Sequence, residues 1–266
     1  MEIVISRHVE FGVPLWITSL DLKKAFDRLE HCALFEALRD QDVQPPEIAL
    51  LLDLHIEQKG SGNGNPELDI LRGVKQGDTL SSLLFNAGIE HAIKKWKRRL
   101  DNHGILIHVG RERLSKVRYA DDILLFAKSF EEMRVMIDML SKELLNIGLE
   151  MHPSKTKILT SCNPLPCHMV DAGDMMIEIL SFEKSHKYLG RLLNLDPSVR
   201  ISIEVRNRLN ASWAKFHEHR DSLCNHNVPI GLRLRLFDTI VTPVVLYAGA
   251  VLPLSQKDLE QLDIVQ

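Results

Sequence analysis

The sequence lacks the features that define several classes of protein. Its four cysteines have no disulfide-framework spacing, which favours a reducing compartment. The net charge of −3 gives the chain no overall basic character, so any surface for nucleic acid must be local. No amino-terminal signal segment is present, and no apolar run approaches the length of a membrane span. These absences predict a soluble, intracellular protein.

What is present is typical of a globular protein. The 266 residues are 45% hydrophobic and 26% charged, which is enough for one large domain or two smaller ones. The apolar pattern predicts strands mixed with helices up to about residue 193. After it, Asp196 and Pro197 form a helix start, and only helices are predicted. We therefore predict the α+β class, with domains at residues 1–192 and 193–266.

Short buried strands alternate with amphipathic helices in the first domain. Strands are predicted at residues 14–20, 104–109, 114–120, 123–127, 157–160, 175–180 and 184–190. Helices are predicted at residues 27–39, 46–57, 79–100 and 129–147. Two of these helices begin with the spacing of a capping box, formed by Asp27 with Glu30 and by Ser129 with Glu132.

Three aspartates stand at the ends of predicted strands. Asp21 follows the first strand, and Asp121 with Asp122 occupies the tip of the hairpin between the third and fourth strands. Burying one unpaired carboxylate is costly, and two adjacent ones also repel each other. If the strands are neighbours in one sheet, the three carboxylates converge and suit divalent cations such as Mg²⁺. The alternative is a surface turn, with Asp21 capping a helix.

Five ordered segments carry a resemblance to a known family. They are SLDLKKAFDRLEH (19–31), RGVKQGDTLSSLLFN (72–86), RYADDILLFAKS (118–129), GLEMHPSKTKIL (148–159) and HKYLGRLL (186–193). This series closely resembles the palm motifs of reverse transcriptases, particularly those of non-LTR retrotransposons, and is also similar to group II intron enzymes. Five motifs in order are far more specific than any single one.

The resemblance implies both a fold and an activity. The fold would be a right-hand polymerase palm, an antiparallel sheet backed by helices, followed by an all-helical thumb. The activity would be that of an RNA-directed DNA polymerase, which uses two Mg²⁺ (or Mn²⁺) ions to add dNTPs to the 3′-hydroxyl of a DNA primer on an RNA template. Two alternatives stay open: a catalytically inactive retroelement remnant that folds or binds RNA only, and a carboxylate-palm nucleotidyl cyclase.

The resemblance also implies catalytic roles for individual residues. Asp21 and Asp121 match the metal ligands of the family, with Asp122 in support and the backbone carbonyl of Leu22 as an additional ligand. Lys155 matches the lysine proposed to protonate the pyrophosphate leaving group. The alternative for Lys155 is an ordinary solvated lysine in a polar loop.

A second group of residues matches the nucleotide-binding positions of the family. Phe26 matches the aromatic ring that packs under the sugar and leaves no room for a 2′-hydroxyl, which selects deoxynucleotides. The alternative is a plain core phenylalanine. Gln76 and Gly77 match the pair that supports template and nucleotide, and Ala120 would line the nucleotide pocket.

Primer and duplex contacts are implied farther along the chain. Tyr119 would line the primer end, and Tyr188, Leu189 and Gly190 resemble the primer grip, a tight hairpin that positions the 3′ end. Residues predicted to face a nucleic-acid backbone from a thumb helix are Arg200, Arg206, Arg208 and Lys215. The basic run at 94–99 is interpreted as a solvated helix end.

A fingers region is expected to be missing. Relatives carry this region ahead of the first palm motif, where its basic residues hold the dNTP triphosphate. Here only residues 1–13 precede the first predicted strand, and Arg7 is their sole Lys or Arg. We therefore expect this chain alone to bind the triphosphate weakly and to polymerise poorly.

Overall fold

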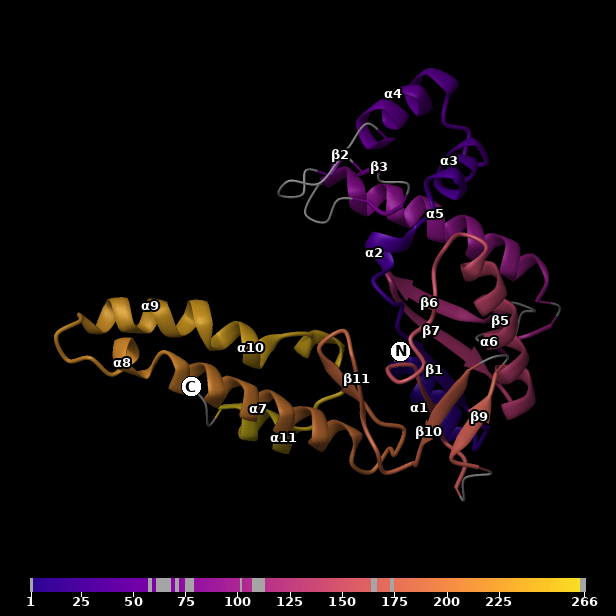
Figure 1. Cartoon of the computed structure of the whole chain (residues 1–266). Coiled ribbons are helices and arrows are strands. Elements are labelled where there is room, and N and C mark those ends of the chain that lie inside the picture. Colours follow the sequence, from indigo (N-terminus) through magenta and orange to yellow (C-terminus); the bar gives the residue numbers. More distant parts are fainter. Residues whose placement is uncertain are drawn as a thin grey trace. The chain divides into compact units, whose positions relative to one another are not determined.

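The computed structural model describes residues 2–56, 59–60, 68–69, 72–74, 79–100, 102–106, 113–163, 167–172 and 175–263. The chain divides into two compact units (Figure 1). We call Pro14–Ser181 the sheet unit, and Met1–Val13 together with Phe182–Gln266 the helical unit. The change of unit at Phe182 differs from the sequence-based boundary at residue 193.

A mixed six-stranded sheet, counted within the described residues, forms the centre of the sheet unit. Its spatial order is β6 (Lys116–Tyr119), β7 (Asp122–Ala127), β1 (Trp16–Leu20), β8 (Lys157–Thr160), β10 (Met176–Leu180) and β9 (Met169–Asp171). Neighbouring strands run antiparallel except β8 and β10, which are parallel. Every side chain of β1 is buried, and so is every side chain of β7 after Asp122. β7 is a continuous apolar run after Asp122, which suits such burial, whereas β1 also buries the polar side chains of Thr18 and Ser19.

Helices pack on this sheet and enclose the core. Helix α6 (Phe130–Leu145) packs on β1 and β7, and α5 (Thr79–Arg98) packs against α6 and α3 (His31–Arg39) (Figure 1). Their apolar side chains join those of the two strands in one hydrophobic cluster. Trp96 is fully buried there, and its indole Nε1 donates to the carbonyl of Met136 at 3.0 Å. The predicted sheet backed by helices is therefore confirmed.

Two strand predictions differ from the structure. The strand predicted at 114–120 is divided at Ser115 into β5 (Arg113–Leu114) and β6, and β5 pairs with β4 (Ile105–Leu106) in a separate small sheet. Of the strand predicted at 104–109, residues 107–109 lie outside the described residues. The described residues of the unit also form α4 (Pro45–Ile56), β2 (Lys59–Gly60) and β3 (Leu68–Asp69).

The prediction of one helix at 27–39 was wrong, because two helices occupy this stretch. Helix α2 (Ala25–Arg28) ends at Leu29, whose backbone is extended with φ −58° and ψ 120°, and α3 begins after Glu30. The carbonyl of Leu29 accepts a hydrogen bond from the N–H of Gly73 at 2.7 Å. This long-range pairing outweighs the local capping signal, since tertiary context overrides propensity.

The prediction for the start of α6 was half correct. Ser129 caps the helix, and its hydroxyl accepts from the N–H of Glu132 at 3.2 Å. The carboxylate of Glu132 accepts instead from the N–H of Lys128 at 2.9 Å and from the N–H of Gly104 at 2.6 Å. Glu132 is buried, and it therefore ties α6 to the segment before β4.

The helical unit contains one β-hairpin and a series of helices among its described residues. These elements are α1 (Glu2–Glu10), β11 (His186–Tyr188), β12 (Arg191–Leu193), α7 (Arg200–Glu218), α8 (Arg220–Leu223), α9 (Ile230–Ile240), α10 (Thr242–Leu246), η1 (Gly249–Val251) and α11 (Gln256–Asp263). Helix α7 packs against β12, α9, α10 and α11. The helical region after Asp196 is thus confirmed, whereas α1 was not predicted.

One apolar stretch corrects the expectation that no run approaches the length of a membrane span. Ile230–Val251 is long and apolar enough to cross a membrane by length and composition, and 6% of its most apolar window is buried. The stretch includes α9, α10 and η1, with Arg233, Arg235 and Asp238 in its first half. A single stretch of this kind is weak evidence for a membrane span.

Replacing Glu132 by glutamine should destabilise the sheet unit. Lys128 and Gly104 donate to different oxygens of the carboxylate, and the amide has only one oxygen. One hydrogen bond is therefore lost and the other is no longer charge-assisted, so we expect a loss of about 1–3 kcal/mol in the free energy of unfolding. Urea unfolding measures this loss. The matched control is Glu131→Gln at the exposed neighbouring position, and equal stability of both variants would contradict the assignment.

Candidate active site

The register of β1 against β7 brings three aspartates to one end of the sheet. Leu20, the last residue of β1, is paired with Ile123 of β7. Continuing this antiparallel register places Asp21 opposite Asp122, at the spacing of cross-strand neighbours. Asp121 lies beside Asp122 in the turn that joins β6 to β7. All three side chains are half-buried.

The three carboxylates interact electrostatically. The pKa of Asp122 is raised by burial first, and then by the negative charges of Asp121 and Asp21. The donor set consists of carboxylate oxygens, which suit Mg²⁺. Among the residues that the structure describes, however, no three acidic, His or Cys side chains form a group that could hold a metal ion. Carboxylate oxygens fit a divalent cation chemically, although in this structure the three carboxylates are not grouped as a metal site.

The segment around Lys155 is held against the end of β1. The N–H of His152 donates to the carbonyl of Asp21 at 2.8 Å, and the hydroxyl of Thr156 accepts from the N–H of Asp21 at 3.4 Å. Leu22 forms an isolated bridge with Met151. Exposed Lys155, one residue before Thr156, carries its Nζ 3.7 Å from the carboxylate of Asp21.

Phe26 lies half-buried beside this end of the sheet unit. Its ring stacks on the fully buried ring of Phe85, with centroids 4.5 Å apart and planes inclined by 24°. The carbonyl of Phe26 accepts from the N–H of Val74 at 2.7 Å. This packing is compatible with both a nucleotide-facing and a core role. Gln76 and Gly77 lie outside the described residues.

The turn between β6 and β7 has an unusual backbone. Ala120 has a φ of 53°, which costs about 1–2 kcal/mol for a residue with a side chain. The guanidinium of Arg118 donates to the Ala120 carbonyl at 3.0 Å and to Asn86 Oδ1 at 2.7 Å. Tyr119, between them, is 69% exposed. The side chain of Arg118 thus holds the turn from the face opposite Tyr119.

A second tight turn lies in the helical unit, between β11 and β12. Tyr188 pairs with Arg191 across the hairpin, and the two turn residues have positive φ angles, 46° at Leu189 and 75° at Gly190. The hydroxyl of Tyr247 donates to the carbonyl of Leu189 at 2.9 Å. A Cβ on Gly190 would lie 3.3 Å from the Tyr247 ring, so glycine allows this close approach.

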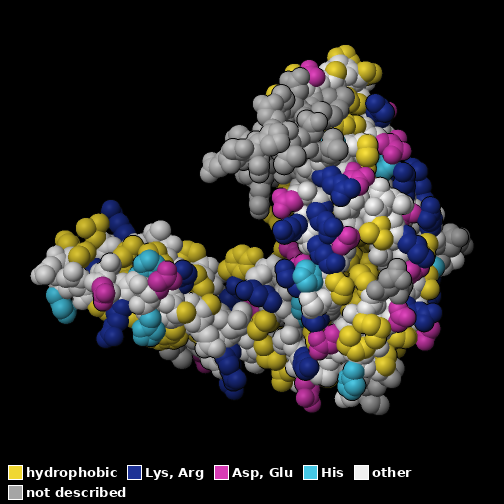
Figure 2. All heavy atoms as spheres, in the orientation of Figure 1, with side chains coloured by type: hydrophobic (Ala, Val, Ile, Leu, Met, Phe, Trp, Pro, Cys, Tyr) yellow, Lys and Arg dark blue, Asp and Glu magenta, His cyan; other side chains and the backbone are white. Residues whose placement is uncertain are grey.

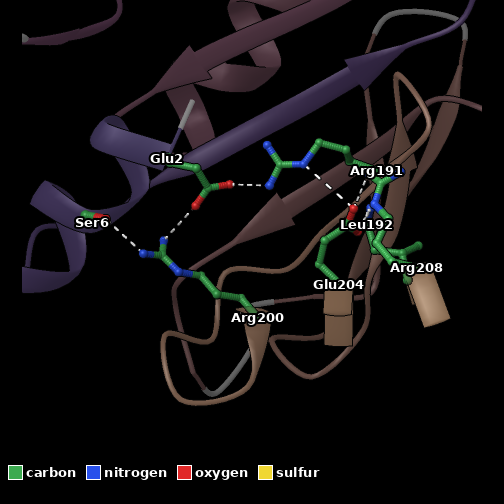
Figure 3. A network of polar contacts seen from close by, with 7 residues as sticks. All are labelled: Glu2, Ser6, Arg191, Leu192, Arg200, Glu204 and Arg208. Carbon is green, nitrogen blue, oxygen red and sulfur yellow. Dashed lines mark hydrogen bonds and ion pairs between the residues drawn. The ribbon is translucent and has the colours of Figure 1, made fainter. Parts of the chain in front are cut away.

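Ion pairs connect this hairpin to α1 and α7 (Figure 3). Arg191 lies 2.8 Å from Glu2 and 3.9 Å from Glu204. Glu204 also accepts from the N–H of Leu192 at 2.8 Å and pairs with Arg208 one helical turn later. These side chains are between 1% and 15% exposed, so removing one partner would leave a costly, largely buried charge unpaired.

Charged side chains of both signs are interspersed on the face of the molecule in Figure 2. Lys and Arg lie beside Asp and Glu on both units there, in keeping with the net charge of −3. Any electrostatic attraction of a polyanion must therefore come from local groups of residues.

A sequence model described as "Reverse transcriptase (RNA-dependent DNA polymerase)" matches residues 11–193. The chain belongs to the reverse transcriptase family. The matched segment contains Asp21, Asp121, Asp122 and the hairpin at Tyr188. The family assignment made from the five motifs is therefore confirmed, and with it the assignment to RNA-directed DNA polymerases by family.

Curated relatives support the non-LTR type of reverse transcriptase. The chain is 28% identical over 209 residues to the Pol polyprotein of a type-1 R2 retrotransposable element from Nasonia vitripennis, covering 72% of this chain and 19% of that protein. It is 32% identical over 160 residues to the corresponding protein of Bradysia coprophila, covering 59% of this chain and 18% of that protein. The chain spans less than a fifth of the length of these relatives.

A solved structure of telomerase from Candida tropicalis, determined with a fragment of telomeric RNA, also resembles the chain. The TM-score is 0.49 at 13% sequence identity, and the match covers 100% of this chain and 45% of the telomerase chain.

Two of the four basic residues predicted to face nucleic acid are instead buried in ion pairs. Arg208 is 6% exposed, pairs with Glu204 and lies 4.7 Å from the centre of the Tyr247 ring. Arg200 lies 3.6 Å from the carboxylate of Glu2. These two predictions are corrected, because a buried guanidinium bound to a carboxylate is not presented to a phosphate.

For the other two of these four residues, Arg206 and Lys215, contact with a nucleic-acid backbone stays a prediction. Arg206 is exposed on α7, on the same helix as Trp213, which is 45% exposed. Lys215 is half-exposed and lies 2.7 Å from Glu218. Both side chains are positioned where solvent, and therefore a phosphate, can reach them.

Sequence reasoning missed the residues that support the aspartate turn. Arg118, Asn86 and Glu90 are joined by hydrogen bonds, yet Asn86 and Glu90 lie on α5, far from Arg118 in the chain, and Glu90 is outside the five motifs. One sequence feature could have indicated that Arg118 supports the turn: it directly precedes Tyr119 on the strand that leads into the turn. The spacing of Asn86 and Glu90, four residues apart on a helix, was a second signal.

Replacing Asp121 by asparagine should raise the thermal stability in metal-free buffer at pH 7, by about 1–3 °C, because repulsion between half-exposed carboxylates is modest. A raised pKa of Asp122 means that its contribution to stability is fully present below the ordinary carboxyl pKa of about 3.9 and is lost as the pH rises through the raised value. The gain in the variant should therefore disappear towards pH 3.

Melting temperatures measured from pH 3 to pH 8 by calorimetry check this expectation. The matched control is Asp53→Asn on α4, where the aspartate is exposed and lies outside the carboxylate group. A gain of the same size at pH 3 and at pH 7, or no gain at all, would contradict the repulsion among the three carboxylates.

Proposed function

We propose that this chain contains the catalytic centre of an RNA-directed DNA polymerase, which adds dNTPs to the 3′-hydroxyl of a DNA primer on an RNA template. The observation that carries the proposal is the β1–β7 register, which brings Asp21 opposite Asp122 with Asp121 alongside. Membership of the reverse transcriptase family supports the same reaction. Template, primer and dNTPs are thus the proposed partners, and an intracellular location remains an expectation.

Asp21 and Asp121 would hold two Mg²⁺ or Mn²⁺ ions, with Asp122 and the Leu22 carbonyl as further ligands. Oxygen donors and mutual repulsion among the carboxylates both support a site for divalent cations. When bound, such ions would activate the attacking hydroxyl and stabilise the leaving oxygen of the phosphoryl transfer.

Lys155 is proposed to donate a proton as pyrophosphate leaves. Its Nζ lies 3.7 Å from Asp21 and is solvent-exposed, so it is within reach of a ligand held by that carboxylate. Transfer of the proton to the departing oxygen would balance the loss of a proton from the attacking 3′-hydroxyl. Lys155 would then act as a general acid beside the carboxylates.

Other residues would position the substrates. Phe26, backed by the rigid ring of Phe85, is proposed to exclude a 2′-hydroxyl from the sugar position. Gln76, Gly77 and Ala120 would border the nucleotide, and exposed Tyr119 the primer end. The hairpin turn at Leu189 and Gly190 would guide the primer strand, with Arg206 and Lys215 near the duplex backbone.

The alternative is a retroelement protein that folds or binds RNA without catalysis. Within the described part of the chain, no group of at least three His, Cys, Asp or Glu side chains could hold a metal ion. Incorporation of labelled dNTP on an RNA template discriminates the two functions, because RNA binding alone adds no nucleotide.

Asp21→Asn and Asp121→Asn should each abolish dNTP incorporation, with a loss of at least about a thousandfold expected when transition-state charge is no longer neutralised. Asp122→Asn should reduce incorporation less. Primer extension on an RNA template with Mg²⁺ measures the rates. Because this chain alone is expected to polymerise poorly, all variants are compared in a fusion to the fingers segment of a relative. The matched control is Asp27→Asn, an exposed aspartate of the same motif, which should keep the activity. Near-normal turnover by Asp21→Asn would overturn the assignment of the metal ligands.

Phe26→Val should raise the use of ribonucleotides relative to deoxynucleotides by about tenfold or more, because a steric clash with the 2′-hydroxyl is removed. Single-nucleotide incorporation with dNTP and NTP gives the two kcat/KM values. Phe130→Val is the matched control, since Phe130 is another half-buried phenylalanine that packs on Trp16. Unchanged discrimination by Phe26→Val would assign Phe26 to the core alone.

A further inference from the structure

Arg118 forms a hydrogen-bonded clamp on the turn that carries two of the aspartates. Its side chain is 14% exposed. The guanidinium Nη1 donates to Asn86 Oδ1 at 2.7 Å and to the carbonyl of Ala120 at 3.0 Å, and Nη2 donates to Glu90 Oε2 at 3.2 Å. The planar guanidinium thus links the side chains of Asn86 and Glu90 to the carbonyl of Ala120.

Asn86 and Glu90, which we call the two anchors of Arg118, lie on a helix that is fixed independently of the turn. Asn86 and Glu90 lie one helical turn apart on α5 and therefore on one side of that helix. Neighbouring residues Phe85 and Ile89 are fully buried in the hydrophobic cluster, which fixes the helix. Arg118 is consequently held in place before it contacts the turn.

The turn depends on such support because its first residue is strained. Ala120 adopts a positive φ of 53° without being glycine. Of the two turn residues, Ala120 and Asp121, only Ala120 has a positive φ, in a backbone region where glycine is usual. If Ala120 relaxed to a negative φ, the directions of Asp121 and Asp122 would change with it.

We propose that Arg118 is a positioning residue of the reverse transcriptase: anchored by Asn86 and Glu90, it holds the Ala120 carbonyl and so fixes the turn from which Asp121 and Asp122 project. The proposal rests on the proposed function, because it concerns the orientation of the same carboxylates. Arg118 acts through the turn and touches no substrate.

The matched control is Lys116, which lies two residues earlier on the same face of β6. Its Nζ is 3.9 Å from the carboxylate of Glu90, so it shares an anchor with Arg118. Lys116→Met and Arg118→Met each remove one positive charge from β6, the strand that leads into the aspartate turn. Loss of charge alone should tighten cation binding in both variants, whereas a misplaced turn should weaken it in Arg118→Met alone.

The first measurement is hydrogen–deuterium exchange of the turn amides at residues 119–122. Arg118→Met should speed their exchange by about tenfold, which corresponds to losing one hydrogen bond, and Lys116→Met should leave it unchanged. Arg118→Lys, which keeps the charge but cannot bridge three acceptors, should give an intermediate value. Equal exchange in Arg118→Met and the unaltered chain would overturn the proposal, as would equal acceleration in Lys116→Met.

The second measurement is the dissociation constant of Mn²⁺, determined by electron paramagnetic resonance. Arg118→Met should weaken Mn²⁺ binding by about tenfold, while urea unfolding identifies any global loss of stability. If Arg118→Met does not fold, the variant Asn86→Ala, which removes one anchor, takes the place of Arg118→Met in both measurements. An unaltered chain that neither binds Mn²⁺ nor incorporates dNTP would overturn the proposed function, whereas the exchange of the turn amides still decides the role of Arg118.

Discussion

The antiparallel pairing of β1 with β7 is the interaction on which the candidate site depends. Both strands are mainly apolar and buried on both faces, so their packing fixes their register. A slip by one residue would turn every side chain of a strand to the other face of the sheet. The register in turn sets Asp21 opposite Asp122, and the burial of ordinary apolar side chains thereby determines the spacing of the charged ones.

The same pairing creates a local electrostatic cost. Burial and the neighbouring charges of Asp121 and Asp21 raise the pKa of Asp122, which means that the folded chain resists full ionisation of the group. Lys155, at 3.7 Å from Asp21, reduces this repulsion only slightly because it is exposed to solvent. The core of the sheet unit stabilises this unfavourable arrangement, and a divalent cation would relieve it.

Sequence patterns predicted the elements whose stability is local or whose burial is continuous. β1, β7 and α5 are of this kind, and so is the cap at Ser129. The patterns did not predict features decided by distant partners. The helix break at Leu29 depends on a hydrogen bond from Gly73, and the carboxylate of Glu132 binds the N–H of Gly104. Arg208, Arg206 and Lys215 look alike in the sequence, yet Glu204 and Tyr247 bury only the first of them.

The two turns proposed to position substrates are stabilised in the same way. Ala120 and Leu189 both have positive φ angles, at 53° and 46°, where glycine would be less strained. In each turn a side chain donates a hydrogen bond to the carbonyl of that residue, from Arg118 in the first and from Tyr247 in the second. Each donor is itself held, Arg118 by its anchors on α5 and Tyr247 by the guanidinium of Arg208. Strained backbone persists where surrounding contacts over-determine it, and such positions are concentrated at functional sites. At both turns the backbone conformation differs from the one that local propensity favours. Tertiary hydrogen bonds stabilise it there, at positions that the proposed site uses.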